Sequence, residues 1–485
     1  MKGDIMRFPI RAIVPAFIFI MVLFLSGDTS AMRLGGNFWF WDTWSPEKPF
    51  KEGVNFGTTT DPWNPVFMDE VKIYSLLRFM ENNRTNNSGV SDWSERRQKT
   101  NPVQEGGWAD ANGGPGIAYE WMIDLCNRIK CDMWTCIPHL SIAPALGTNP
   151  RDYALRLCIL AKTGVDMRTV PLQDKFNKLS TMTAQDFITA GGVKTCEPLA
   201  PGLKLYLEYS NELWHEGFAQ GRYAGTMGQQ MNLSTSRDAA RHRFTAWASV
   251  RIYQAMDLVY GKDSKNGIKI ASVSGLSLGE QIKIFNDTIN YNKTGSMPTA
   301  LSVVTYFNGS SIDQLKQAAA TSYSPANMAN FRRAADAYHA QLISYEGGPS
   351  CDKSLNSNPG MFDVVTTFCN TVAQSLDVLA FYCHCSANEY GAKTNTGQPI
   401  SEAHKYRALV QWATAHPVST IGQTAPLRLY VPRQHEGLYP AVTLTGQVFG
   451  RTSEGSTLKL LHSHAAGFLV TGDRSVPVRV LRFDK

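Results

Sequence analysis

Eight short runs of β-forming residues, separated by longer helix-like stretches, constrain the fold of this 485-residue chain more than any other feature. Such alternation is typical of repeated βα units, in which helices cover a sheet of parallel strands. Eight units are the number that closes a (β/α)8 TIM barrel. We therefore predict an α/β fold with this barrel over residues 32–418. The predicted strands are residues 34–41, 74–80, 132–140, 203–210, 268–275, 300–307, 340–347 and 377–384.

The character of the sequence changes after about residue 420. Alternating runs such as "AVTLTGQVFG" and "VPVRVLRF" are separated by Gly, Ser, Asp and Pro, and no helical pattern lies between them. This pattern predicts a small all-β C-terminal module over residues 419–485. A segment of this size buries little core, so we expect it to pack on the barrel.

The N-terminus has the pattern of a secretory signal. Lys2, Arg7 and Arg11 precede the apolar run "AIVPAFIFIMVLFLS", and small residues follow it near Ala31. We predict a signal peptide over residues 1–31 and a secreted or periplasmic protein. The alternative is an uncleaved membrane anchor. It is disfavoured because about 14 apolar residues interrupted by Pro15 are short for a span of about 20.

Composition excludes several classes of function. Apolar residues make up 43% of the chain and charged residues 18%, as in globular proteins. The net charge is +6, and Lys and Arg are scattered, so no nucleic-acid partner is expected. Nine cysteines lack zinc-type spacing, although Cys383 and Cys385 flank His384. We expect structural thiols or a few disulfides, with no metal and no cofactor. The oligomeric state is not indicated.

The stretch "LKLYLEYSNELWHEGF" (203–218) carries a strand into two polar groups. Side chains alternate along a strand, so Glu208 and Glu212 share one face and the leucines share the other. Leucines suit the helix layer of a barrel. Glu208 should then lie inside, while Glu212 reaches the C-terminal mouth, where barrel enzymes place their active sites. A buried Glu208 needs a partner, and Arg78 is the candidate.

A second carboxylate, Glu346, ends the apolar run "QLISYEGGPS". By strand count, Glu212 follows the fourth strand and Glu346 ends the seventh, so the two should face each other across the mouth. Two such carboxylates are what retaining glycoside hydrolysis requires: one protonates the leaving oxygen and the other attacks the anomeric carbon. The plain alternative for Glu212 is a carboxylate at a helix start, stabilised by the helix dipole.

The sequence resembles clan A glycoside hydrolases over roughly residues 34–415. "LEYSNE" is similar to the clan's fourth-strand Asn-Glu motif, and "LISYEGG" is similar to its nucleophile strand. Arg78 in "RFM", His139 in "IPHL" and Tyr306 in "VTYF" match residues of the second, third and sixth strands. "EWMIDLCNR" and "YSNELWHEGF" also resemble secreted, cellulase-like bacterial proteins.

The resemblance implies an enzyme that cleaves β-linked oligo- or polysaccharides with retention. Glu212 would be the acid/base and Glu346 the nucleophile. Asn211 would hydrogen-bond the sugar 2-hydroxyl, and Arg78 and Tyr306 would keep Glu346 ionised. Because Glu212 must begin protonated, its pKa is expected to lie above that of Glu346.

Each supporting residue also has a structural interpretation. Arg78 can simply pair with Glu208, His139 can be a core histidine, and Tyr306 can be packing. Trp214, beside Glu212, is expected to line the cleft. One departure from the clan is clear: the eighth strand ends in "FYCHCSANEYGAK", without the usual tryptophan. Tyr390 or His384 are the candidates to replace it.

Two rival functions remain. A carbohydrate-binding barrel without catalysis would keep the fold and its aromatic residues, and the missing tryptophan favours it slightly. A metal-dependent barrel hydrolase would need converging His and Asp residues at the strand ends, which the sequence does not show.

Overall fold

The structure is a computed structural model, and it describes the chain in two parts. The first part is residues 32–417, without 40, 42–44, 105–114, 143–151, 169, 171, 173–178, 263, 265, 274–295 and 338. The second is the strand segments 439–442, 448–452, 468–473 and 476–482, whose side chains, like those of 271–273, are not described. The predicted signal peptide and the predicted boundary at 418/419 lie outside the described residues.

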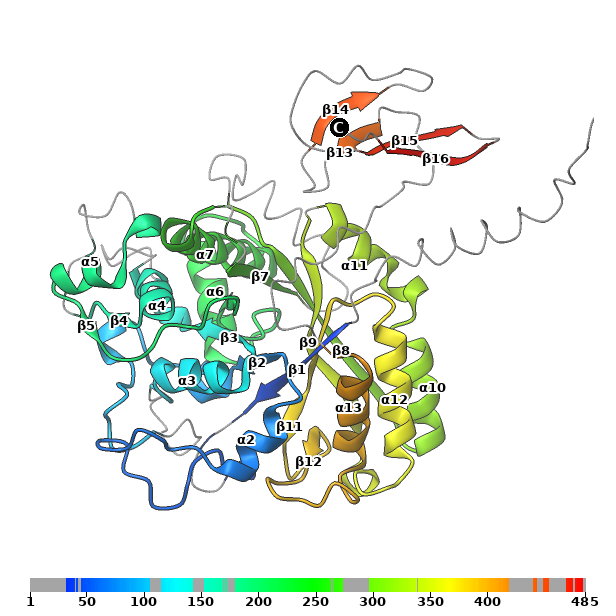
Figure 1. The fold of residues 1–485 in the computed structure, drawn as a ribbon, viewed down its shortest axis with the longest axis horizontal. Coiled ribbons are helices and arrows are strands. Elements are labelled where there is room, and N and C mark those ends of the chain that lie inside the picture. Colours follow the sequence, from blue (N-terminus) through cyan, green and yellow to red (C-terminus); the bar gives the residue numbers. More distant parts are fainter. Residues whose placement is uncertain are drawn as a thin grey trace, which may run out of the picture. The chain divides into compact units, whose positions relative to one another are not determined.

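Eight parallel strands close into a barrel in the order β1-β10-β9-β8-β7-β6-β3-β2 (Figure 1). All eight predicted strands are present in the predicted sequence order, which confirms the (β/α)8 fold. The strands are β1 (Arg33–Phe38), β2 (Leu76–Phe79), β3 (Asp132–Ile137), β6 (Leu205–Tyr209), β7 (Gly267–Val273), β8 (Ala300–Gly309), β9 (Gln341–Cys351) and β10 (Val378–Phe381).

Helices surround the barrel (Figure 1). In the first of them, Pro65 occupies the first turn and the Asn64 side chain accepts from the Val66 amide, which caps the helix. No helix in the described part of the chain is long and apolar enough to cross a membrane. The helices are α2 (Pro65–Val71), α3 (Tyr119–Ile129), α4 (Asp152–Thr163), α5 (Ala184–Thr189), α6 (Ala219–Gln230), α7 (Arg237–Tyr260), α10 (Ile312–Thr321), α11 (Pro325–Ala337), α12 (Met361–Val372) and α13 (His404–Ala415).

The core has two layers, and strand alternation divides the residues between them. Leu205 and Leu207 of β6 belong to the outer layer, between the barrel and the helices. Tyr206 belongs to the layer inside the barrel, and Glu208, which is 1% exposed, lies on the same face. The predicted division of this strand is confirmed, and it directs the end of β6 toward the barrel mouth.

Strand β9 has one extra residue opposite the same stretch of its two neighbours, β8 and β10. Ser344 pairs with Val303 of β8, and Gly347 pairs with Thr305, so three steps along β9 face two along β8. The pairing of β9 with β10 shifts over the same stretch. A β-bulge of this kind lets two successive side chains point to one face.

The bulge turns both Tyr345 and Glu346 into the barrel. Arg78 lies 4.0 Å above the Tyr345 ring and also binds the Glu346 carboxylate. Close packing on the other side of the bulge requires glycine, because a Cβ on Gly347 would lie 2.2 Å from the Thr305 hydroxyl. A regular strand would have sent Glu346 to the helix side.

The chain divides into two compact units, Met1–Gln423 and Thr424–Lys485. The second unit holds two antiparallel pairs, β13 (Tyr439–Val442) with β14 (Val448–Thr452), and β15 (Phe468–Asp473) with β16 (Val476–Arg482). This confirms a small β module. The first unit holds two further short pairs, β4 (Val165–Asp166) with β5 (Val193–Lys194), and β11 (Cys383–Cys385) with β12 (Gly391–Lys393).

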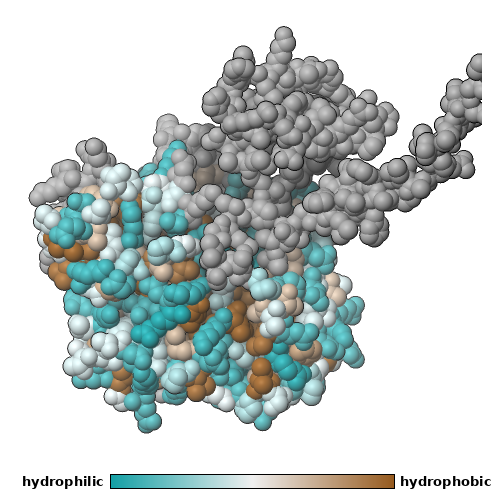
Figure 2. Space-filling model, in the orientation of Figure 1, coloured by the Kyte–Doolittle hydropathy of each residue, from teal (hydrophilic) through white to brown (hydrophobic). Residues whose placement is uncertain are grey.

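On the described face that Figure 2 shows, hydrophobic residues are scattered among hydrophilic ones. The large hydrophobic side chains that are exposed come from separate elements, such as Val66 on α2 and Leu258 on α7. Isolated exposed apolar residues are normal on a soluble surface, so they do not define a docking face.

Candidate active site

Arg78 on β2 is the centre of the site, and its side chain is fully buried. The guanidinium donates to four side chains: Asn37 at 3.0 Å, Glu208 at 3.2 Å, Asn211 at 2.8 Å and Glu346 at 2.9 Å. Both interpretations of Arg78 are therefore true at once, because it pairs with the scaffold residue Glu208 and also binds Glu346. The planar fork of arginine suits this divided task better than an ammonium group.

Glu346 is held from two sides. Arg78 donates to Oε1, and the hydroxyl of Tyr306 on β8 donates to Oε2. The side chain is 5% exposed, so the carboxylate is oriented by these donors more than by water. Two donors of this kind favour the ionised form of a carboxyl group.

Glu212 follows β6 in a left-handed backbone conformation, with φ of +48°, and Ser210 has φ of +53°. Non-glycine residues rarely adopt this region, and where they do the strain is often found at functional sites. The Glu212 amide donates to the Tyr345 hydroxyl at 3.1 Å, which ties the end of β6 to β9. The side chain is 23% exposed, and its Oε2 lies 3.4 Å from His215 Nε2.

Asn211 is fixed by a chain of polar side chains. Its Oδ1 accepts from Arg78 and from the Tyr345 hydroxyl, and its Nδ2 donates to Asn86 Oδ1 at 3.1 Å. Gln220 on α6 donates to the same Asn86 oxygen and to the Asn211 carbonyl at 3.0 Å. An amide with both ends bound keeps one orientation, as a group that recognises a hydroxyl must.

Burial shifts the titration of both carboxyl groups upward. It raises the pKa of Glu346 to about 7, against the opposing effects of the Arg78 charge and the Tyr306 hydrogen bond, and the charge of Glu212 adds to the rise. Burial also raises the pKa of Glu212, again against Arg78. The expectation that the pKa of Glu212 lies above that of Glu346 stays a prediction, since burial raises both.

Hydrogen-bond donors still distinguish the two carboxyl groups. The carboxylates repel each other when both are ionised, and this repulsion contributes to the raised pKa of Glu346. Arg78 and Tyr306 direct N–H and O–H groups at Glu346 and stabilise its anion there. Between the two carboxyl groups, these donors favour the ionised form at Glu346.

Aromatic rings gather after the eighth barrel strand, where the sequence lacks the clan's usual tryptophan, and we call this group the aromatic wall. Tyr382, directly after β10, stacks on Tyr390 with ring centroids 4.4 Å apart and contacts Tyr306 at 4.6 Å. Trp39, after β1, completes the group at 5.8 Å from Tyr382. Of the two candidates named from the sequence, Tyr390 lies in this wall. His384 does not, because it is fully buried elsewhere.

The other predicted residues lie as follows. Trp214 is partly buried and packs edge-on against Tyr345 at 5.1 Å, close to Glu212. His139 follows β3 and is 2% exposed, and its ring contacts Tyr223 of α6 at 5.3 Å. Burial lowers the pKa of His139 to about 4, so its ring is neutral. Among the described residues, no hydrogen bond connects His139 to either carboxylate.

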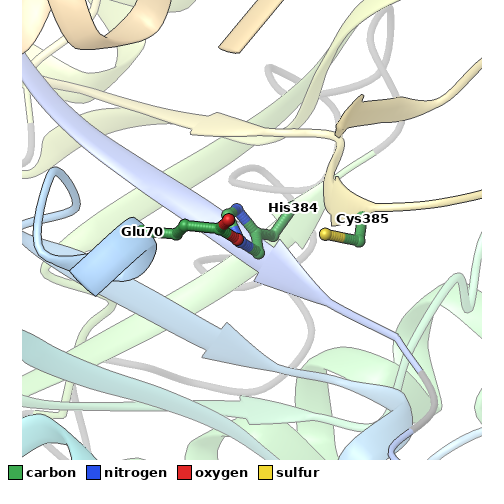
Figure 3. A group of neighbouring side chains, drawn as sticks. All are labelled: Glu70, His384 and Cys385. Carbon is green, nitrogen blue, oxygen red and sulfur yellow. The ribbon is translucent and has the colours of Figure 1, made fainter. Parts of the chain in front are cut away.

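A second polar cluster lies between β1, α2 and α13. Glu70, His384 and Cys385 offer an oxygen, a nitrogen and a sulfur within 4.8 Å of one another (Figure 3). The Lys393 ammonium already binds Glu70, whose Oε1 also accepts from the Gly397 amide at 2.9 Å. Burial raises the pKa of the Cys385 thiol, so the thiolate that a metal needs is disfavoured. This cluster is therefore a buried ion pair with a neutral histidine, and we call it the Glu70 network.

Several site residues could not be named from the sequence. Asn37, Asn86, Gln220, Tyr345 and Tyr382 all contact the carboxylates or their partners. Asn86 lies in the Asn-rich loop "NRTNNSG" after the second strand, and that composition was the available signal. Tyr345 precedes Glu346 directly, and regular strand alternation would have placed these two side chains on opposite faces of the strand.

Comparison with known proteins adds similarities of low degree. No family model matches the chain, and no curated protein matches it. An α-L-arabinofuranosidase from Thermotoga maritima, solved with arabinose, has 13% identity and a TM-score of 0.49, covering 80% of this chain and 70% of its own. A family 51 α-L-arabinofuranosidase from Bifidobacterium longum has 12% identity and a TM-score of 0.48, covering 80% and 75%.

A xyloglucanase of Glycoside Hydrolase Family 44 from Paenibacillus polymyxa is also similar. It has 11% identity and a TM-score of 0.37, and the match covers 76% of this chain and 79% of its own. At identities and TM-scores this low, we take the function from side-chain geometry and not from these similarities.

Proposed function

We propose that the protein is a retaining glycoside hydrolase that cleaves β-linked glycans by double displacement, with Glu212 as acid/base and Glu346 as nucleophile. One observation carries the proposal: a carboxyl group just after the fourth barrel strand and another at the bulge of the seventh, of which only Glu346 is bound by Arg78 and Tyr306. Retaining hydrolysis needs this asymmetry, since one group must begin ionised and the other protonated.

The first step would form a glycosyl-enzyme. An ionised oxygen of Glu346 bonds to the anomeric carbon, and the bond from that carbon to the leaving oxygen breaks with its electron pair going to the oxygen. Protonated Glu212 gives its proton to this oxygen, so no alkoxide is released. Asn211, held by Arg78 and Tyr345, would bind the sugar 2-hydroxyl.

The second step would reverse the roles. Glu212, now ionised, takes a proton from water, and the water oxygen bonds to the anomeric carbon. The ester bond to Glu346 breaks and its electron pair returns to the carboxylate. Both residues are thereby restored, and the sugar keeps its anomeric configuration after two inversions.

Trapping of the intermediate tests the proposal. We would incubate the protein with activated 2-deoxy-2-fluoro-β-glycosides of glucose, xylose and galactose, and then sequence the labelled peptide by mass spectrometry. A sugar ester on Glu346 in the native chain, absent from Glu346→Gln, is the expected result. If the protein neither hydrolyses nor traps any of these glycosides, yet binds glycans in calorimetry, it is instead the non-catalytic carbohydrate-binding barrel.

We further propose that the protein is exported, on the basis of the N-terminal basic and apolar run. Its partners would be oligo- or polysaccharides, without nucleic acid and without a membrane once the signal is removed. N-terminal sequencing of the protein from culture medium or periplasm is the measurement. A mature chain that begins near residue 32 supports export, and one that retains Met1 in the cytoplasm contradicts it.

A further inference from the structure

The tautomer of His215 is fixed by its neighbours. The Gly217 backbone N–H donates to His215 Nδ1 at 2.9 Å. A backbone N–H can only donate, so Nδ1 must present its lone pair, and the proton of the neutral ring must be on Nε2. Nε2 lies 3.4 Å from Glu212 Oε2. The neutral ring therefore directs an N–H group at the proposed acid/base.

The same arrangement opposes a charged ring. A second proton would have to bind Nδ1, where it would face the Gly217 N–H. Burial lowers the pKa of His215, and the charge of Arg241 on α7 lowers it further. His215 is thus held neutral at neutral pH although it is next to a carboxyl group, which by itself would favour the cation.

The segment that carries His215 is held in place from two helices. A Cβ on Gly217 would lie 2.9 Å from His215 Nδ1, and a Cβ on Gly221 of α6 would lie 1.9 Å from the His215 carbonyl oxygen. Arg241 donates to the Trp214 carbonyl at 2.8 Å. Substitution of either glycine would displace the ring, so the backbone is built around this position of the histidine.

We propose that His215 is a positioning residue that supplies a neutral N–H donor to Glu212 during the reaction. This inference rests on the proposed function. A cationic neighbour would lower the pKa of Glu212 strongly and remove the proton that the first step needs. A neutral donor stabilises the carboxylate only moderately, so Glu212 can hold a proton at rest and still have a partner once it is ionised. A hydrogen bond that is long in the free protein shortens when the carboxylate forms.

Other charged groups also act on this pair, and none of them replaces the donor. Glu212 interacts with Arg78 of β2, with Glu208 of its own strand and with Glu346 of β9. Its charge also acts on the hydroxyl groups of Tyr306 and Tyr382. On the side of His215, Arg241 is the charged neighbour from α7. Removal of His215 should therefore raise the pKa of Glu212, because one group that favours its anion is lost.

The tautomer can be measured without any substrate. We would label the full chain with 15N-histidine and identify His215 as the resonance lost in His215→Gln. The expected result at pH 7 is a neutral ring with the proton on Nε2 and titration below the ordinary histidine pKa of about 6.5. A ring protonated on Nδ1 at pH 7, alone or together with Nε2, overturns the inference whether or not the protein is an enzyme.

The catalytic role needs substrates that differ in their demand for acid assistance. We would compare kcat/KM for the phenyl and 2,4-dinitrophenyl β-glycosides of glucose, xylose and galactose. In His215→Ala, kcat/KM should fall about tenfold or more for the phenyl glycoside and less than about twofold for the dinitrophenyl glycoside, which leaves without a proton. In the pH profile of kcat/KM for the phenyl glycoside, the apparent pKa of the basic limb should rise by about half a pH unit.

Two variants complete the test. His215→Gln keeps an N–H donor near Nε2 and should restore much of the phenyl activity, whereas His416→Gln, at the end of α13, should change nothing. Equal losses for both leaving groups would make His215 merely structural and overturn its role. A native chain that hydrolyses none of these glycosides would refute the proposed function, and the role of His215 with it, while leaving the tautomer result intact.

Discussion

Two buried glutamates of this barrel, Glu346 at the mouth and Glu70 between the barrel and its helices, are each bound by a cation, yet only one surrounding suits chemistry. At the mouth, one guanidinium serves Glu208 and Glu346 and also acts on Glu212. In the Glu70 network, one ammonium serves one carboxylate beside a histidine whose pKa is lowered by burial. Where buried carboxylates outnumber the cations, burial and mutual repulsion raise their pKa values and favour proton exchange, whereas the Glu70 carboxylate, paired with one ammonium, has a lowered pKa.

Replacement of Glu346, the proposed nucleophile, should have the largest effect. Glu346→Gln keeps the shape and the hydrogen bonds to Arg78, but an amide cannot form the ester. We expect kcat to fall by about 10⁴-fold or more with little change in the melting temperature. The measurement is steady-state hydrolysis beside a thermal melt. The matched control is Glu70→Gln in the Glu70 network, whose kcat should stay within about twofold of the native value. A comparable loss of kcat in both variants would show that Glu346 is no more catalytic than Glu70.

Removal of the other cation should affect stability instead. Lys393→Met leaves the Glu70 carboxylate buried without its ammonium, and we expect the free energy of unfolding at pH 7 to fall by about 3–5 kcal/mol. Denaturant titration followed by fluorescence measures this. The folded fraction should keep its kcat/KM.

The double variant Glu70→Gln/Lys393→Met is the matched control. It removes both charges, so it should recover much of the stability that Lys393→Met loses. If the double variant is less stable than the single variant by the full cost of a second substitution, Lys393 does not act through Glu70.

Loss of the Tyr306 hydroxyl should change the pH dependence of activity at the mouth. Its O–H favours ionised Glu346, so Tyr306→Phe raises the pKa of Glu346 above its native value of about 7. Because attack needs the anion, the acidic limb of kcat/KM should move up by about one pH unit, and activity at pH 7 should fall several-fold. Tyr323→Phe is the control, since that hydroxyl binds the Tyr306 carbonyl. If the acidic limb of kcat/KM does not move in Tyr306→Phe, the Tyr306 hydroxyl does not stabilise ionised Glu346.

The smallest effect is expected at the aromatic wall. Tyr390→Ala removes the ring stacked on Tyr382, and an aromatic contact of this kind contributes about 0.5–1.5 kcal/mol. We expect KM to rise about two- to tenfold with kcat nearly unchanged, measured on whichever aryl β-glycoside of glucose, xylose or galactose the native chain hydrolyses. A fall in kcat without a change in KM would place Tyr390 in the chemistry and not in binding.

Much of the barrel was predictable because its signals are local. Alternation within "LKLYLEYS" separated Glu208 from the leucines, and the strand count placed Glu212 and Glu346 at the same mouth. The wall and the Glu70 network were not predictable in this way. Tyr382 and His384 are two residues apart, yet one faces the mouth and the other is buried beneath α2, beside a glutamate 314 positions away (384 − 70). Such pairings follow from tertiary packing, which spacing in one sequence does not encode.

The upward shift of both pKa values was also not predictable from the sequence. The motif assigns a proton donor and a nucleophile, but burial acts on both carboxyl groups, and its extent depends on the side chains that close over them. The orientation of Glu346 depends in turn on the bulge, which no local pattern in "QLISYEGGPS" signals.

The bulge in β9 has a genetic consequence. Two codons lie between those for Ser344 and Gly347, and loss of either would restore a regular register between β9 and β8. Loss of the Tyr345 codon would leave Glu346 on the inner face but remove the ring below Arg78 and the hydroxyl that binds Asn211. Loss of the Glu346 codon would keep Tyr345 inside and remove the carboxylate itself. In each case a single event removes one inward-facing side chain and keeps the strand pattern.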